Sequence, residues 1–109
     1  MKNYLAIAVF SVLASAGLQA MAQESDVSKA YMEAHERMMS QMMSVKPSGD
    51  ADMDFVMMMI PHHEGAIEMA AVELKYGKDP TLKKIAQQII DTQKKEIEEF
   101  KKWQTEHGM

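Results

Sequence analysis

The sequence predicts an all-α protein, an up-and-down antiparallel bundle of three helices at about residues 25–44, 52–76 and 79–106. Apolar side chains recur at three- and four-residue intervals through most of the chain, and no alternating strand pattern competes with them. Two short segments rich in Pro, Gly and Asp, at 45–51 and 77–80, interrupt this pattern. Short connections between long helices favour antiparallel neighbours. A single domain of this size has marginal stability, so we also expect completion of the bundle by a second copy, a homodimer, or stabilisation by a ligand.

The N-terminal residues 1–22 have the features of a secretory signal peptide. Lys2 precedes an apolar run from Tyr4 to Leu18, and the small-residue site Ala20-Met21-Ala22 follows. A membrane anchor is the alternative, but the run is shorter than the roughly 20 residues that span a bilayer. We therefore expect residues 23–109 to be a single soluble domain, located in the periplasm after cleavage.

The composition of residues 23–109 limits which metal sites the protein can form. This segment carries 11 of the 13 methionines and all four histidines, and the chain has no cysteine. Cysteine-rich zinc and iron–sulfur sites are thereby excluded, and a soft-metal site must use methionine sulfur. Acidic residues outnumber basic ones by 16 to 11, which argues against nucleic-acid binding.

The ends of the helices are predicted from capping residues. Ser25 or Asp26 is expected to cap the first helix, and Asp52 the second. Gly77 is expected to end the second helix in a left-handed conformation. The third helix is expected to begin with Asp79 as its cap and Pro80 in its first turn.

The second helix contains two residues that disturb a regular helix. Pro61 cannot donate a backbone hydrogen bond, so we expect the helix to kink or restart there. Gly65 has no side chain and is expected to admit the close approach of another helix or to leave room for a ligand.

The apolar stripe of the third helix includes two polar residues, Gln93 and Glu96. A polar group on a buried face requires a hydrogen-bonding partner. The alternative is that both side chains reach solvent at the boundary of the stripe.

Methionine and histidine residues are clustered in the second helix. Met58 precedes His62 by four residues, and Met59 precedes His63 by four, so these side chains share neighbouring turns, with Met69 two turns further along. Thioethers and imidazoles are ligands that copper prefers. Methionine also fills irregular cores and lines promiscuous binding surfaces, which is the alternative explanation of the cluster.

The first helix repeats the combination of methionine and histidine. Met32-x-x-His35 has the same spacing as Met59-x-x-His62, and Met39 and Met42 follow within two turns. Di-iron bundles use Glu-x-x-His pairs, but no carboxylate lies three residues before any histidine here. A zinc protease motif is also excluded, because its second histidine would fall at Ile67.

Several of these motifs together resemble the CopM-like family, secreted helical proteins long catalogued only as a domain of unknown function. The resemblance rests on Asp54-Phe55, on Met58-Met59-Ile60-Pro61-His62-His63, on Ala66-Ile67 and Met69-Ala70, and on Ile89, Gln93, Glu96-Ile97 and Trp103. It implies a ferritin-like bundle and periplasmic copper binding linked to copper resistance. His62, His63, Met58, Met59 and Met69 match the family motif, and the methionines of the first helix match in kind. Phe100 stands where family members often have methionine, so the resemblance does not supply a ligand from the third helix.

We therefore expect a periplasmic protein that sequesters or relays Cu(I), with Cu(II) or Ag(I) as alternative ions. The expected ligands in the second helix are Met58, Met59 and Met69, with His62 or His63; those in the first helix are His35 and Met39, with Met32 or Met42. A copper exporter or another periplasmic copper protein is the expected partner. The alternative function is a metal-free adaptor or chaperone-like module that binds a protein. No arrangement of general bases or nucleophiles is present in the sequence, and we expect no enzymatic activity.

Overall fold

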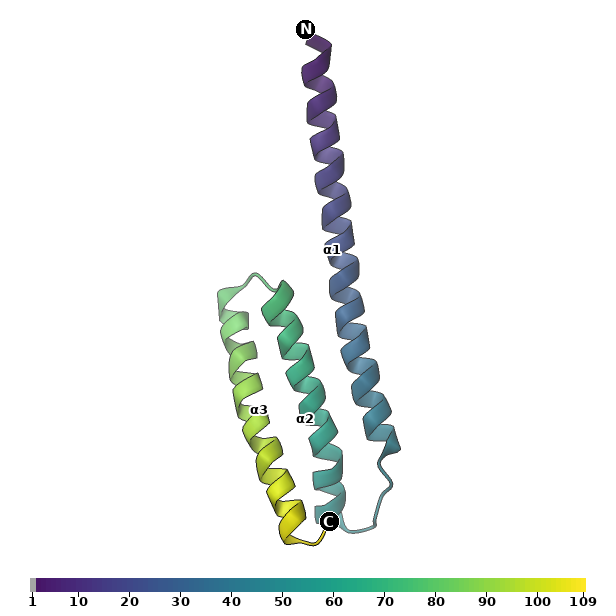
Figure 1. The fold of residues 1–109 in the computed structure, drawn as a ribbon, viewed down its shortest axis with the longest axis vertical. Coiled ribbons are helices and arrows are strands. Elements are labelled where there is room, and N and C mark those ends of the chain that lie inside the picture. Colours follow the sequence, from purple (N-terminus) through teal and green to yellow (C-terminus); the bar gives the residue numbers. More distant parts are fainter. Residues whose placement is uncertain (1) are drawn as a thin grey trace. The chain divides into compact units, whose positions relative to one another are not determined.

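The computed structural model describes residues 2–109, with side chains described from Ser15 onward. It contains three helices and, within the described residues, no strand: α1 (Lys2–Ser44), α2 (Ala51–Tyr76) and α3 (Pro80–Glu106) (Figure 1). The predicted all-α class and three-helix architecture are confirmed. The chain divides into two compact units, residues 1–30 and 31–109, and the second unit contains α2, α3 and the last 14 residues of α1.

The start of the first helix was predicted wrongly. α1 is continuous from Lys2 to Ser44, so neither Ser25 nor Asp26 acts as a cap. No proline or glycine interrupts residues 18–44, and good helix formers lie on both sides of the expected cap, at 21–24 and 29–30, so the helix continues through it. Part of the predicted signal peptide, residues 1–14, lies outside the residues whose side chains are described. In the part of the chain that the structure describes, no helix has the length and apolar character needed to cross a membrane.

The cap of α2 is Asp50, two residues before the predicted cap, and the helix begins at Ala51. The Asp50 side chain accepts a hydrogen bond from the Met53 backbone N–H at 2.9 Å, and Asp52 instead lies in the first turn. Asp50 has extended backbone angles, as a cap requires, and it follows Gly49, whose φ of 88° turns the chain. The helix then continues through Pro61 without restarting.

The connection between α2 and α3 agrees only in part with the prediction. Gly77 follows α2 with an extended conformation (φ −66°, ψ 154°), not the left-handed one expected, and its N–H donates a hydrogen bond to the Glu73 carbonyl at 2.7 Å. Asp79 caps α3 by accepting a hydrogen bond from the Leu82 backbone N–H at 2.9 Å, and Pro80 opens the helix as predicted.

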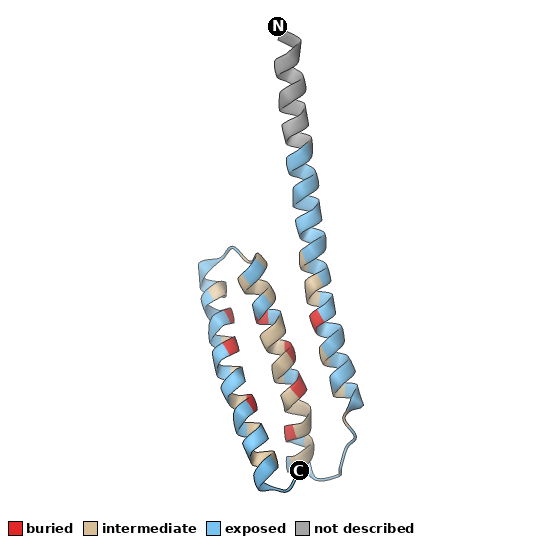
Figure 2. Ribbon diagram, viewed as in Figure 1, coloured by how far each residue is buried: buried red, intermediate tan, exposed pale blue. Residues whose placement is uncertain are grey.

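The core of residues 31–109 is small and is centred on α2. Ala70, Ala86 and Ile90 form its main cluster, with Ile67, Leu74 and Ile89 packed around it. On its other side α2 contacts α1, where Met38 lies directly over Gly65. Buried positions are accordingly few and scattered along the helices (Figure 2). Among the described residues no large apolar side chain is fully buried.

The loop between α1 and α2 is held by Asp54. Its carboxylate accepts hydrogen bonds from the Ser48 N–H at 2.7 Å, the Ser48 hydroxyl at 2.6 Å and the Gly49 N–H at 3.2 Å. The bonds from the Ser48 side chain and backbone lower the pKa of Asp54 below its ordinary value.

We expect this loop clamp to weaken in acid. A carboxylate with a lowered folded-state pKa contributes stability above its unfolded pKa, about 3.9, and that contribution is lost as the pH falls through the folded value. The Asp54→Asn variant should therefore be less stable than the parent at neutral pH, and the difference should shrink as the pH falls below the unfolded pKa and through the folded one. Chemical denaturation of both proteins as a function of pH measures this difference. A constant difference across that range would show that the carboxylate charge is not responsible.

Candidate functional site

Two contacts fix how α1 and α2 face each other. Met38 packs against Gly65 so closely that a Cβ added at Gly65 would lie 2.5 Å from the Met38 Sδ. The Arg37 Nε donates a hydrogen bond to the Glu68 Oε2 at 3.0 Å. Met38 and Gly65 therefore mark the line of contact, and Arg37 and Glu68 mark the same side of that line on both helices.

The predicted ligands lie mainly on the opposite side of this line. Successive helical residues are rotated by about 100°, so Met59, His62 and Met69 lie about 40–120° from Gly65, on the side away from Glu68. By the same measure, four residues of α1 lie about 40–120° from Met38 on the side away from Arg37. Arg37 and Glu68 lie on the same side of the helix pair, so the side of α1 away from Arg37 and the side of α2 away from Glu68 together form one surface. We call this surface the methionine–histidine face; its residues are Met32, His35, Met39 and Met42 of α1 and Met59, His62 and Met69 of α2.

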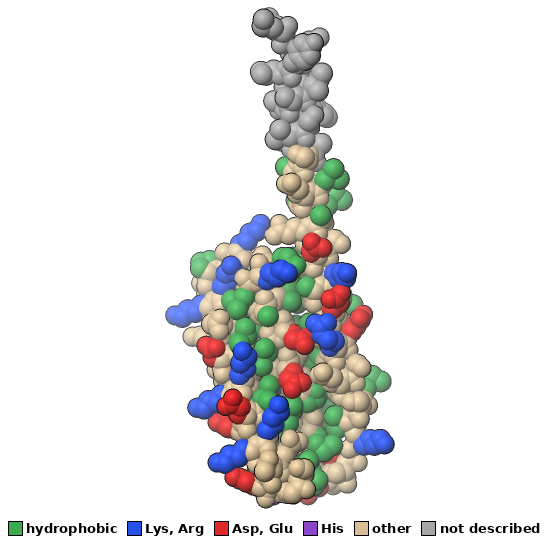
Figure 3. Space-filling model, viewed as in Figure 1, with side chains coloured by type: hydrophobic (Ala, Val, Ile, Leu, Met, Phe, Trp, Pro, Cys, Tyr) green, Lys and Arg blue, Asp and Glu red, His purple; other side chains and the backbone are tan. Residues whose placement is uncertain are grey.

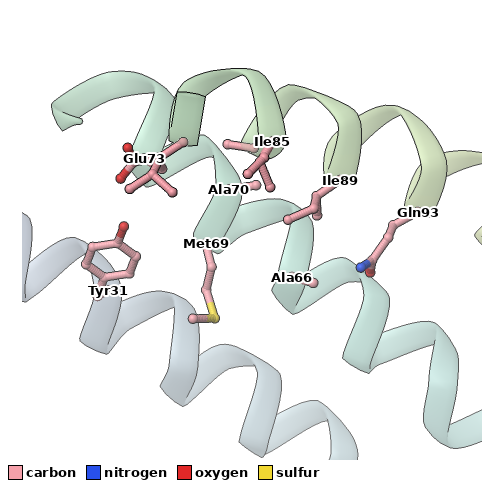
Figure 4. A pocket seen from close by; sticks show the side chains of 10 residues that line it. Tyr31, Ala66, Met69, Ala70, Glu73, Ile85, Ile89 and Gln93 are labelled. Carbon is pink, nitrogen blue, oxygen red and sulfur yellow. The ribbon is translucent and has the colours of Figure 1, made fainter. Parts of the chain in front are cut away.

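The methionine–histidine face is open and continues onto α3. Met39 and Met69 keep 40% and 41% of their surface exposed. An apolar groove of about 360 Å³ lies on this side, with Tyr31 and Met69 on one wall and Leu82, Ile85 and Ile89 of α3 on the other (Figure 4). Leu82 and Ile85 are apolar residues of α3 that remain exposed, because α2 lies between α3 and the α1 segment of this unit (Figure 1).

A different surface is drawn in Figure 3. There a band of hydrophobic side chains runs between Lys or Arg and Asp or Glu side chains, and no histidine of the described residues is visible.

The ligands on the methionine–histidine face fall into two groups along the helices. Since Met38 lies opposite Gly65 in an antiparallel pair, one turn forward on α1 corresponds to one turn back on α2. This register places Met42 level with Pro61, next to His62, and Met39 level with Glu64, two residues from His62. With Met59, nearly one turn from His62, these residues form the lower group. The same register places His35 level with Met69, and these two with Met32 form the upper group. His62 and Met69 are seven residues apart, or about 10 Å along the helix axis.

Met58 and His63 do not belong to this face. Met58 lies about 20° from Gly65 and so points to the contact with α1, where it is half-buried. His63 lies about 160° from Gly65, towards α3, and its side chain is only 12% exposed. The structure therefore separates the two adjacent histidines: His62 is exposed, while His63 is inserted between helices.

His63 is held by α3 on two sides. Its Nε2 lies 2.5 Å from the Glu96 Oε2, and its ring meets the Phe100 ring edge-to-face at 5.3 Å between centroids. The Glu96 side chain remains 44% exposed. The need for a partner at Glu96 could be predicted from its place in an apolar stripe, but the identity of that partner could not. For Gln93, the other exception in that stripe, the buried Oε1 has no hydrogen-bond donor in the structure.

Met38 is a methionine of α1 that was not among the expected ligands but that the structure places at the contact with α2. It lies on the contact line between the groups, with its sulfur against Gly65. The sequence feature that pointed to Met38 was its helical spacing, three residues after His35 and four before Met42. That spacing did not show whether the side chain faces a metal or a glycine.

The donor set of the face is soft. Within residues 15–109, no group of three or more His, Asp or Glu side chains gathers where one ion could be held. By helical position, each of the two groups combines thioether sulfurs with one imidazole. Such a set fits a soft monovalent ion such as Cu(I) better than a hard ion that requires oxygen ligands.

Comparison with known proteins gives a family without an assigned activity. A search of curated proteins finds no match to the sequence. The family described as domain of unknown function DUF305 matches residues 7–104, nearly the whole chain. The chain therefore belongs to the DUF305 family.

Proposed function

We propose that this protein binds Cu(I) through its methionine–histidine face and sequesters or relays it in the periplasm. The observation that carries the proposal is that thioethers and imidazoles from two helices share one open face, although they are spread over nearly 40 residues of sequence. A methionine used only for packing gains by being buried, yet Met32, Met39 and Met69 are exposed. The resemblance to CopM-like proteins supports the same reading.

The exposure of the face suits transfer as well as storage. A ligand that reaches solvent can be replaced by a donor atom of a partner without unfolding the bundle. The lower group offers Met39, Met42, Met59 and His62, and the upper group offers Met32, His35 and Met69. We propose that each group holds one Cu(I), with a copper exporter or another periplasmic copper protein as the recipient. Cu(II) lacks an affinity for thioethers and would rely on imidazole alone, whereas Ag(I) should compete.

An anaerobic titration of the purified chain with Cu(I), in competition with a chromogenic chelator, tests the proposal. We expect two Cu(I) per chain. His62→Ala should remove or weaken the lower site and His35→Ala the upper one, so each variant should lose about one equivalent of tight binding. His107→Ala is the matched control, because His107 stacks on Trp103 at 4.0 Å near the C-terminus, away from both groups. Absence of Cu(I) binding by the parent chain would contradict the proposal.

The metal-free adaptor is the competing function, and one observation favours it. The apolar groove beside Met69 is large enough to receive side chains of a partner, and Leu82 and Ile85 on its wall are exposed. The two functions separate under mutation: partner binding in this groove should survive the double variant His35→Ala/His62→Ala, whereas tight Cu(I) binding at both groups should not.

A further inference from the structure

His63 has an environment unlike that of the other histidines on the helices. It lies between α2 and α3, and its ring orientation is fixed by Phe100, which in turn packs edge-to-face against Phe55 at 5.7 Å. Its Nε2 contacts the Glu96 carboxylate, while its Nδ1 is buried and has no hydrogen-bonding partner. The two ring nitrogens therefore face different chemistry.

The carboxylate determines where the proton of the ring resides. An ionised carboxylate only accepts hydrogen bonds, so the Nε2 facing Glu96 must carry the proton and donate it. A second proton on Nδ1 would be a buried N–H with no acceptor, which folded proteins avoid. The geometry thus favours the tautomer with its proton on Nε2, which leaves the lone pair of Nδ1 without a partner.

We infer that Glu96 is a positioning residue that presents the His63 Nδ1 as a copper ligand. A histidine bound to a metal through one nitrogen commonly donates its other N–H to a carboxylate, which fixes its tautomer and orientation. Here the carboxylate is already in place and the lone pair is the one polar function of the ring left unused. This inference rests on the proposed Cu(I) function and adds a ligand that the methionine–histidine face does not contain.

Neighbouring residues fit this role. The ring of His62 lies 6.2 Å from that of His63 between centroids. Imidazole nitrogens coordinate metals at about 2 Å, so rings at this separation can hold one ion between them. Met59 precedes His63 by one turn and His62 by nearly one turn, which places a thioether beside both. His63 would therefore join the lower group from the side that faces α3. In the Nε2–H tautomer, Nδ1 carries no proton that Cu(I) would have to displace.

The competing explanation is structural: the His63–Glu96 pair would only hold α2 against α3. Heteronuclear NMR on the ¹⁵N-labelled chain separates the two roles, because the ¹⁵N shifts of an imidazole report which nitrogen carries a proton. Without copper, we expect His63 to be protonated at Nε2 and unprotonated at Nδ1. Adding Cu(I) anaerobically should shift the Nδ1 resonance while the Nε2–H is retained.

Two results of this experiment would overturn the inference. One is Cu(I) binding with no change at the His63 Nδ1, which leaves the proposed function intact. The other is a change at Nε2 with loss of its proton, which means that copper displaces Glu96. If the parent chain binds no Cu(I), the proposed function falls together with this inference.

Variants of Glu96 test the positioning role independently. Glu96→Ala removes the acceptor and should weaken Cu(I) binding by about 10- to 100-fold, the usual effect of removing such a partner. Glu96→Gln keeps an oxygen that accepts the Nε2–H and should retain most of the affinity and the tautomer. Glu98→Ala, an exposed carboxylate on the same helix, is the matched control. Circular dichroism confirms that each variant is folded. Equal losses in the Ala and Gln variants, or none in Glu96→Ala, would contradict the role of the acceptor.

Discussion

Replacing Met58, Met59 and Met69 together by leucine should weaken Cu(I) binding by at least about 100-fold and leave the helical fold intact. Leucine and methionine have similar volumes, so such exchanges cost a core little. The loss of affinity should be large, because even removing groups that only orient metal ligands costs about 10- to 100-fold. Two of the three residues, Met59 and Met69, lie on the methionine–histidine face, one in each group. The competition titration measures the affinity, and circular dichroism measures the fold.

The chain offers a matched control for this triple variant. Met53 and Met57 lie on α2 about 80–120° from Gly65 on the side of Glu68, away from the methionine–histidine face. Met109 is the C-terminal residue. Replacing these three by leucine removes the same number of sulfur atoms and should leave Cu(I) binding unchanged. Equal affinity of the two triple variants would show that the face does not bind the metal.

Gly65→Leu should be the most destabilising single substitution in α2. Even a Cβ at this position would lie 2.7 Å from the Met38 Cβ, an atom that moves only with the α1 backbone. Overpacking of this kind typically costs about 1–3 kcal/mol, and the full leucine side chain should reach the upper end of that range or beyond. Gly65→Ala should cost less, because alanine recovers up to about 1 kcal/mol of helix propensity.

Thermal unfolding followed by circular dichroism measures this effect. A loss of 3 kcal/mol corresponds to a melting temperature lower by roughly 12–24 °C in a domain of this size. Ala71→Leu is the control, since Ala71 is exposed on the same helix. The double variant Gly65→Ala/Met38→Ala should recover stability lost in Gly65→Ala by removing the opposing side chain. No difference between Gly65→Leu and Ala71→Leu would mean that α1 does not pack tightly here.

The sequence was sufficient to predict the elements of the fold whose causes are local. Asp79 and Pro80 define the start of α3 by capping and by a fixed backbone angle, and both are as predicted. The role of Gly65 in a close helix contact also follows from its lack of a side chain. The cap of α2 was misplaced by two residues, because Asp50 and Asp52 are chemically equivalent and only the turn at Gly49 distinguishes them.

The arrangement of the candidate site required tertiary information. Helical spacing placed His62 and His63 on turns next to those of Met58 and Met59, but only the position of α3 shows that His63 turns towards Glu96. Likewise, the spacing of His35 and Met39 in α1 could not show which residues of α2 lie opposite. The Arg37–Glu68 ion pair supplies that information, because it identifies matching sides of the two helices.

The exposure of the methionines on the open face has a consequence for oxidation chemistry. Met32, Met39 and Met69 are accessible to peroxide and other oxidants, which convert a thioether to a sulfoxide. A sulfoxide is polar and presents oxygen where sulfur was, so each oxidised residue exchanges a soft donor for a hard one. The capacity of the protein for a soft ion would then record its oxidative history, and enzymatic reduction of the sulfoxides would restore it.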